Sequence, residues 1–387
     1  MKKTILNLLV ILSGWVLLAQ TDQSKIVIEK WADPTKEVPI SIKGFSGEVA
    51  AILKFDLEVM GCKVVPEESA SYNVEGSNNG NVQGRLFVGK TRNQLIGKSY
   101  TGGTLRSQTH AFADDVIFAI TGIKGIAQTK IAFKGDLGST SEIFISDYDG
   151  YNPIQITKDN SISAAPSWIP GKFALVYNSY KSGFPDIYSH DLGSGIRKVI
   201  AKYSGSNISP AVSPDGTRVA MILSKGGSPN LYVANIDGSG LQRLTTTREG
   251  ESSPCWSPDG KTICFTSRAG GSAALYTIPS TGGQMKRLQT IGAVNATEPD
   301  WSPDGSMIAF TAQMGGFQIC VVPSTGGEAK ILAAGADPSW APNSRTIIFT
   351  RNAGKGVRSL SLIDIYTKQI KDCHRLSASC SQPCWAK

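Results

Sequence analysis

The chain has 387 residues, of which 41% are hydrophobic and 18% charged, a composition that is typical of globular domains and excludes a disordered or fibrous protein. Its 39 basic and 31 acidic residues give a net charge of +8 at pH 7, but the basic residues are scattered and not interleaved with aromatic residues, so nucleic-acid binding is not indicated. Seven cysteines without a Cys-x-x-Cys spacing and three widely separated histidines argue against a zinc, redox or catalytic metal site, and we expect no cofactor.

The first twenty residues have the pattern of a secretory signal. Two lysines precede the apolar run TILNLLVILSGWVLLA, and Leu17-x-Ala19 provides a cleavage site, which predicts a signal peptide over residues 1–20. The run is short for a membrane span and no other stretch approaches one, so we expect an exported protein that does not insert into a membrane. Cleavage removes Lys2 and Lys3, which leaves 37 minus 31, or +6, and a basic balance fits an acidic partner surface.

Residues 21–125 predict a compact domain that mixes helices and strands. KIVIEK, CKVVP, SYNVEG, VQGRLFVGK and LIGKSYT have the pattern of strands. Ser46–Met60 carries an apolar stripe with helical spacing, and Ser46 can cap its first turn. Leu105–Thr121 predicts a second helix, with Gly122 at its C-terminal end.

A motif of the form Pro-x-aromatic-Ser-Pro-Asp-Gly recurs through residues 126–387. Its first prolines are 44, 44, 45, 39 and 45 residues apart, at Pro166, Pro210, Pro254, Pro299, Pro338 and Pro383. A period of about 40–45 residues with strand-like segments indicates a β-propeller with one blade per repeat.

One repeat shows how a blade is built. Pro254–Ser257, Thr262–Thr266, Ala274–Pro279 and Met285–Leu288 predict four short strands, and Asp-Gly and Gly-Gly turns tolerate the positive φ that tight turns need. Four such strands cannot bury both faces alone, so each blade must stack on its neighbours.

The two ends of the array predict how the ring closes. The first repeat begins directly with KIAFKG at Lys130 and lacks an anchor proline, whereas the chain ends with the orphan anchor PCWAK at Pro383. Placing this segment as the innermost strand of the first blade gives six complete blades and removes the open edges. The expected fold is an α+β N-terminal domain followed by an all-β six-bladed β-propeller.

The cysteines leave a disulfide question open. Cys255 and Cys264 lie symmetrically about an Asp-Gly turn, so they face each other across two strands either as a disulfide or as two buried thiols. Cys373 and Cys380 are the next candidates for a pair.

Motifs for an enzyme are weak. No G-x-S-x-G elbow of a propeller-containing peptidase is present, and the two GSG segments do not open helices. DYDGYN at Asp147 lacks the terminal glutamate of a calcium loop. A propeller-type hydrolase or lyase, or a sugar-binding protein, is the alternative class, and carboxylates and histidines clustered in the central funnel would favour it.

Three segments together resemble the TolB family, the periplasmic propeller proteins of the Tol–Pal envelope system. These are HAFADDVIFAITGIKGIAQTKIAF from His110, SDYDGYNPIQIT from Ser146 and the PxWSPDG repeats, and the resemblance extends over the whole chain. PSWIPG lacks the aspartate of the turn, the N-terminal domain is hard to align in its middle, and the cysteine count is unusual.

The resemblance implies a non-enzymatic, monomeric adaptor that reaches the periplasm through the Sec pathway. Such proteins bind the peptidoglycan-associated lipoprotein through one propeller face and support outer-membrane integrity and constriction at cell division. The N-terminal segment engages the inner-membrane partner TolA, here by adding a strand, and its candidate residues are Thr21, Asp22, Gln23, Ser24, Lys25 and Ile26.

Topology predicts where the lipoprotein binds. The segments that precede the anchor prolines lie at the opposite end of the strands from the Asp-Gly turns, beside the loops that join second and third strands. We expect contacts there from Ser163, Asn207, Glu251, Ser252, Thr297, Glu298, Lys225, Arg268 and Arg351, with Glu298 as the strongest candidate.

Overall fold

The computed structural model describes residue 33 and residues 35–354, 356–374 and 379–387. The expected signal peptide, the strand KIVIEK and all six candidate TolA contacts lie outside these residues. In the described part of the chain no helix is long and apolar enough to cross a membrane.

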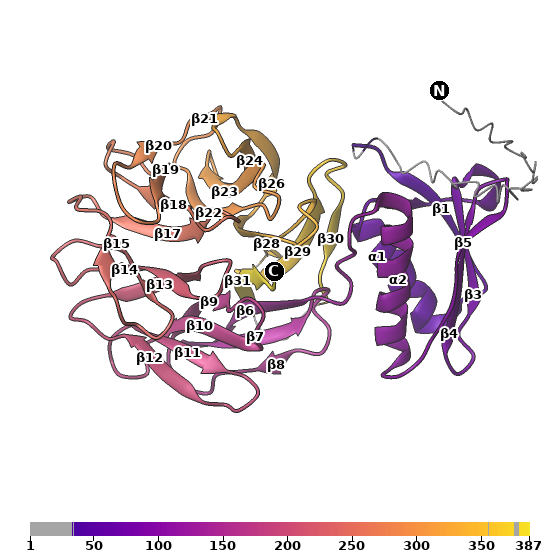
Figure 1. Ribbon diagram of the computed structural model, residues 1–387, viewed down its shortest axis with the longest axis horizontal. Helices are drawn as coiled ribbons and strands as arrows, with labels where there is room; N and C mark the ends of the chain where they lie inside the picture. Colours follow the sequence, from indigo (N-terminus) through magenta and orange to yellow (C-terminus); the bar gives the residue numbers. More distant parts are fainter. Residues whose placement is uncertain (1–32, 34, 355, 375–378) are drawn as a thin grey trace, which may run out of the picture.

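The N-terminal domain is a five-stranded sheet with two helices on one face (Figure 1). The strand order is β2-β1-β3-β4-β5, in which β1 pairs in parallel with β2 and β3 and the other pairs are antiparallel. The strands are β1 (Val38–Lys43), β2 (Cys62–Val64), β3 (Tyr72–Ser77), β4 (Val82–Val88) and β5 (Asn93–Tyr100), with a 3₁₀ turn, η1 (Glu67–Ser69). The sequence does not predict β1, which pairs with both β2 and β3, because Pro39 within it normally argues against a strand with two neighbours.

Both expected helices are present, as α1 (Gly47–Val59) and α2 (Leu105–Thr121). Gly122 ends α2 with a left-handed φ of 74°, a conformation that favours glycine. Ser46 occupies the N-cap position of α1, but its side chain makes no capping hydrogen bond and instead approaches Asn78. The helices lie between their own sheet and the propeller (Figure 1).

The remainder of the chain is a six-bladed propeller, as expected. Blades 2, 3 and 4 are meanders formed by β9 (Ser163–Trp168), β10 (Ala174–Ser179), β11 (Asp186–Asp191) and β12 (Arg197–Ala201); by β13 (Asn207–Val212), β14 (Arg218–Leu223), β15 (Asn230–Asn235) and β16 (Gln242–Arg243); and by β17 (Glu251–Trp256), β18 (Thr262–Ser267), β19 (Ala274–Pro279) and β20 (Lys286–Arg287).

Blades 5 and 6 follow the same order. Blade 5 has β22 (Thr297–Trp301), β23 (Met307–Gln313), β24 (Phe317–Pro323) and β26 (Lys330–Ala334), with a small parallel pair of β21 (Thr290–Ile291) and β25 (Gly327–Glu328) beside it. Blade 6 has β27 (Ala336–Trp340), β28 (Thr346–Asn352), β29 (Arg358–Asp364) and β30 (Ile370–Asp372).

Blade 1 is assembled from both ends of the propeller sequence. The C-terminal strand β31 (Ser379–Trp385) pairs with β6 (Lys130–Leu137), which is followed by β7 (Thr140–Asp147) and β8 (Ile154–Gln155). The orphan anchor therefore closes the ring, and its Trp385 is 1% exposed.

Two faces of the propeller are distinguished by their loops. The turn face carries the Ser-Pro-Asp-Gly turns and the turns between third and fourth strands. The linker face carries the loops between second and third strands together with the segments that connect one blade to the next. Backbone hydrogen bonds join these loops and linkers, for example Tyr180 N–H to Ile162 O and Ser224 N–H to Ser206 O.

Candidate functional site

The residue before each anchor proline has an unusual backbone conformation. All six have φ between 49° and 53°, namely Ala165, Ser209, Ser253, Glu298, Asp337 and Gln382. The register between the innermost strand and its neighbour shifts at the same place in every blade, which marks a β-bulge. Left-handed backbone is uncommon for residues other than glycine. Its repetition six times shows that the bulge belongs to the blade design and forms a ring of pre-proline residues.

The ring of pre-proline residues lines a central cavity of about 450 Å³. The anchor prolines, the Ser-Pro-Asp-Gly prolines and several tryptophans supply most of the rest of the wall. Three carboxylates, Glu298, Asp300 and Asp337, and the ammonium group of Lys387 supply its charges. Lys387 Nζ lies 2.8 and 2.9 Å from the two carboxylate oxygens of Asp300. The cavity can accept side chains or an extended segment of a partner, but is too small for a folded domain.

Side chains of the pre-proline ring link blades 5, 6, 1 and 2. Glu298 Oε2 accepts a hydrogen bond from the backbone N–H of Asp337 at 3.1 Å. Asp337 Oδ2 accepts from Gln382 N–H at 3.2 Å, and Gln382 Oε1 accepts from Ala165 N–H at 3.0 Å. Each side chain therefore holds the bulge of the next blade. The ring members in blades 2, 3 and 4 are an alanine and two serines, so the ring is chemically asymmetric.

Glu298, the strongest candidate for a lipoprotein contact, is held by the blade structure around it. It lies within β22, half-buried, and Thr311 Oγ1 also donates to its Oε2 at 2.7 Å. Burial and the nearby carboxylate of Asp337 raise the pKa of Glu298 to about 7. This carboxyl group therefore exchanges its proton near neutral pH at the edge of the cavity.

Three other expected contact residues are buried. Ser163 and Asn207 are 0% exposed and Glu251 is 4% exposed. Asn207 bridges the linker before β13, where it accepts from Tyr203 N–H and donates to Tyr203 O. Glu251 accepts from the hydroxyls of Thr245, Thr247 and Ser267. These side chains are therefore buried rather than exposed at the surface, and the hydrogen bonds of Asn207 and Glu251 are made inside the protein.

The remaining expected residues lie on or near the linker face. Ser252 and Thr297 are half-buried at the start of their inner strands. Lys225 and Arg268 are exposed in loops between second and third strands. Arg351 forms an ion pair at 3.2 Å with a carboxylate of the outer strand of blade 6. Of the nine residues, only Glu298 lines the cavity.

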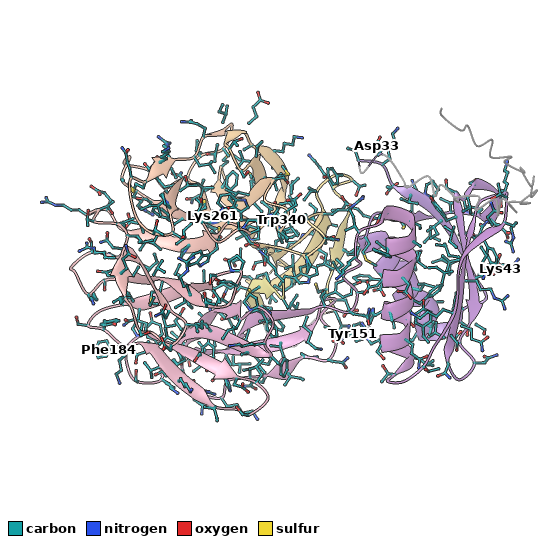
Figure 2. The ribbon with its side chains drawn as sticks, in the orientation of Figure 1. Asp33, Lys43, Tyr151, Phe184, Lys261 and Trp340 are labelled. Atoms are coloured by element: carbon teal, nitrogen blue, oxygen red, sulfur yellow. The ribbon has the colours of Figure 1, made fainter. Side chains whose placement is uncertain are left out.

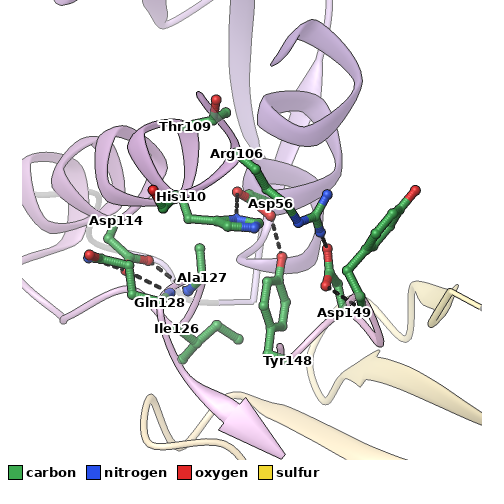
Figure 3. Close-up of polar contacts among 12 residues, drawn as sticks. Asp56, Arg106, Thr109, His110, Asp114, Ile126, Ala127, Gln128, Tyr148 and Asp149 are labelled. Atoms are coloured by element: carbon green, nitrogen blue, oxygen red, sulfur yellow. Dashed lines mark hydrogen bonds and ion pairs between the residues drawn. The ribbon is translucent and has the colours of Figure 1, made fainter. Parts of the chain in front are cut away.

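A second polar site joins the N-terminal domain to the propeller (Figure 3). Asp56 of α1 is 0% exposed and accepts from His110 Nδ1 of α2 at 2.7 Å and from the hydroxyl of Tyr148, in blade 1, at 2.5 Å. Burial alone lowers the pKa of His110, but the hydrogen bond and charge of Asp56 outweigh it, so the net shift is upward. This buried group connects both helices to the propeller.

Further contacts surround this buried group. Arg106 pairs with Asp149 across the interface, and its guanidinium carbon lies 3.7 Å from the ring centre of Tyr151. Tyr151 lies between the propeller and the helices (Figure 2). Lys371 of the propeller pairs with Glu58 of α1 at 2.6 Å. Ion pairs, aromatic contacts and the apolar cluster that both domains share therefore hold them together.

Tight packing continues where the domains meet at blade 6. Gly61 follows α1 with φ of 94°, and any side chain there would collide with the guanidinium of Arg345. Arg345 in turn bonds Asp364 at 2.7 Å.

Trp385 touches both the cavity and the interface. Its ring lines the cavity and stacks on Tyr148 with a centroid separation of 6.1 Å, and its Nε1–H donates to Thr129 at 2.8 Å. The strand that closes the ring therefore also supports the contact with the N-terminal domain.

Nothing in the sequence spacing reveals the Asp56–His110–Tyr148 group. Asp56 lies 54 residues from His110 and 92 residues from Tyr148, and the apolar stripe of α1 gives no reason to single out one carboxylate. His110 and Tyr148 both fall in segments that carry the family resemblance, which is the one signal that could have drawn attention to them.

Histidines do not contribute to the cavity. His110 belongs to the interface, His190 lies in β11 and His374 stacks on Tyr151. Among the described residues, no group of three or more His, Cys, Asp or Glu side chains is placed to hold a metal ion. Cys255 and Cys264 stand opposite each other in register across β17 and β18, both as thiols.

Comparison with known proteins decides the family. A family model described as the TolB β-propeller domain matches residues 118–387, which is more than half of the chain. The chain belongs to the TolB family. Two curated relatives named Tol-Pal system protein TolB align with it, one from Desulfosudis oleivorans with 34% identity over 142 residues and one from Francisella tularensis with 36% identity over 137 residues. These alignments cover 36% and 33% of this chain, and 32% and 31% of the relatives, so the match spans about a third of their length.

Solved structures extend the likeness to both domains. The crystal structure of TolB from Acinetobacter baumannii has a TM-score of 0.81 and 22% identity, and the alignment covers 91% of this chain and 97% of that one. A structure of putative TolB from Agrobacterium tumefaciens has a TM-score of 0.53 with 19% identity over 66% of this chain and 91% of that one. At these identities the likeness shows the fold, an α/β domain joined to a six-bladed propeller.

Proposed function

We propose that this protein is a non-enzymatic periplasmic adaptor of the Tol–Pal system. It binds the peptidoglycan-associated lipoprotein through the linker face and the cavity mouth, and TolA through residues 21–26. In this role it supports outer-membrane integrity and constriction at division. Membership of the TolB family supports a role in the Tol–Pal system, and the curated relatives are named as proteins of that system.

The observation that carries the lipoprotein site is the pre-proline ring. A carboxyl group at the edge of a cavity, already half-buried and held by two donors, is placed to be covered by a docked partner and to accept its hydrogen bonds. Lys225 and Arg268 add exposed cations on the same side of the propeller. Ser252 and Thr297 lie beside the mouth, and Arg351 requires release from its ion pair before it can contribute.

Calorimetry with the soluble domain of the peptidoglycan-associated lipoprotein tests this proposal. Glu298→Ala should weaken binding by about 2–5 kcal/mol, because the partner's donors are then buried without an acceptor. Asp237→Ala is the matched control, since that carboxylate is exposed in a turn of blade 3 on the turn face. An unchanged dissociation constant for a folded Glu298→Ala variant would remove Glu298 from the site.

TolA binding needs its own experiment. A variant that begins at Ile26 lacks Thr21 to Lys25 and should lose affinity for a TolA domain, because strand addition depends on main-chain hydrogen bonds. Full affinity in the shortened protein would end this part of the proposal while leaving the lipoprotein site intact.

A further inference from the structure

The linker face has an uneven charge distribution. Six exposed cations follow one another at intervals of 20 to 23 residues, or one per half blade, across blades 2, 3 and 4; they are Lys158, Lys181, Lys202, Lys225, Arg248 and Arg268. Three lie in loops between second and third strands and three in the linkers that precede blades 2, 3 and 4. We call this set the basic arc.

Backbone hydrogen bonds place the basic arc on one face. Ile162 O, Ser206 O, Pro185 O and Pro229 O each accept from the neighbouring loop or linker, so these segments adjoin one another around the ring. Blades 2, 3 and 4 lie on the side of the propeller remote from the N-terminal domain (Figure 1). The basic arc is therefore not covered by that domain.

Charges of the basic arc are uncompensated. Within the described residues, none of the six cations forms an ion pair. Lys181 and Lys225 rest on tyrosine rings at 4.2 and 4.1 Å, contacts that position an ammonium group and leave its charge unneutralised. Of the nearby acids, Asp159 is bound by Arg197 at 2.7 Å, and Glu249 is exposed beside Arg248.

The other half of the linker face is different. In the described part of blades 6 and 1, Asp136 pairs with Lys134 and Arg358, and Arg351 is also paired. Among the described residues of this half, Glu298 and Asp337 accept hydrogen bonds but form no ion pair, and both lie at the cavity in blades 5 and 6. Among the described residues, the rim over blades 2, 3 and 4 thus carries cations without ion pairs, whereas the cations named in blades 6 and 1 are ion-paired and the carboxylates without ion pairs lie at the cavity.

We propose that the partner on this face is a protein with an acidic patch over blades 2, 3 and 4, and that the charge difference fixes its rotation about the propeller axis. Because the six blades give the mouth a nearly sixfold shape, shape alone would allow the partner to dock in several rotations with similar affinity. Electrostatic complementarity determines register in such cases. A uniformly anionic lipid surface has no group that complements the carboxylates at the cavity, so the arrangement favours a protein. This inference rests on the proposed function, which supplies the linker face as the docking site.

Two charge-reversal variants with equal change in net charge test the inference. The arc variant carries Lys181→Glu, Lys225→Glu and Arg268→Glu, and the control variant carries Lys172→Glu, Lys261→Glu and Lys286→Glu, three exposed lysines towards the turn face. In calorimetry with the soluble lipoprotein domain at low salt, the arc variant should bind about tenfold or more weakly and the control within about threefold of the parent. Equal losses in both variants, or no loss in the arc variant, would overturn the inference and leave the proposed function standing.

A second probe separates this inference from the proposed function. An oligoglutamate peptide of about ten residues should bind the parent and the control at low salt but not the arc variant, and added salt should abolish binding. If the lipoprotein does not bind the parent at all, the proposed function fails, and the peptide alone decides the inference. Absence of peptide binding, or sedimentation of the parent and not the arc variant with phosphatidylglycerol vesicles, would overturn the proposed acidic protein partner.

Discussion

The cavity and the domain interface are both polar sites in apolar surroundings, but they are built in opposite ways. The cavity repeats one structural device six times, and its asymmetry comes from the residues that occupy equivalent positions. The interface is assembled once, from side chains of α1, α2 and blade 1. A repeated site tolerates variation in one copy, whereas a single buried group depends on every member.

This difference explains which features the sequence could predict. Six blades, the closing strand and both helices follow from periodicity and turn chemistry, because each signal is local or repeated. The bulge before each proline could not be predicted, since a residue before proline normally adopts extended backbone. Asp56 could not be singled out either, because its partners come from distant segments. The position of Glu298 before its anchor proline indicates a contact residue, but its burial and its contact with Asp337 depend on the next blade.

Deletion of residues 382–387 should have the largest effect, because it damages both regions. The inner strand of blade 1 loses Trp385, whose removal alone, in Trp385→Ala, should cost about 3–5 kcal/mol. An open ring also exposes strand edges, so the shortened protein should aggregate. Thermal unfolding and size-exclusion chromatography measure both effects. An unchanged melting temperature would show that closure does not depend on this segment.

A substitution in the domain interface should have the next largest effect on stability. Asp56→Ala leaves His110 and Tyr148 without their buried acceptor, and removing one partner of such a group costs about 3–5 kcal/mol. Denaturant unfolding measures the loss, with Asp237→Ala as an exposed carboxylate control that should change stability by less than about 0.5 kcal/mol. Similar values for the two variants would contradict the role given to Asp56.

The pH dependence of stability should come from the cavity through Glu298. Folding raises the pKa of Glu298 from its ordinary value of 4.5 to about 7, so the folded state binds more protons between these two pH values. The resulting stabilisation is fully present below pH 4.5 and is lost as the pH rises to about 7. Melting temperatures measured at pH 5 and pH 8 should therefore depend on pH differently in the parent and in Glu298→Gln. The same change in melting temperature in both proteins would contradict the role given to Glu298.

The smallest effect concerns a single copy of the bulge. Ser253→Gly should change stability by less than about 1 kcal/mol. Glycine adopts positive φ readily, but it loses more conformational entropy on folding than serine does. Ser253→Val should destabilise by about 1–3 kcal/mol, since a β-branched residue is strained in that conformation. Chemical unfolding compares the pair, and equal stability would show that the backbone there relaxes.

Hydrogen–deuterium exchange with and without the soluble lipoprotein domain most directly tests the claim that the propeller mouth binds the partner. We expect slowed exchange in the inner strands around Glu298 and in the linkers and loops of the linker face, with little change in the N-terminal domain. Protection confined to the N-terminal domain, with the inner strands unaffected, would contradict it.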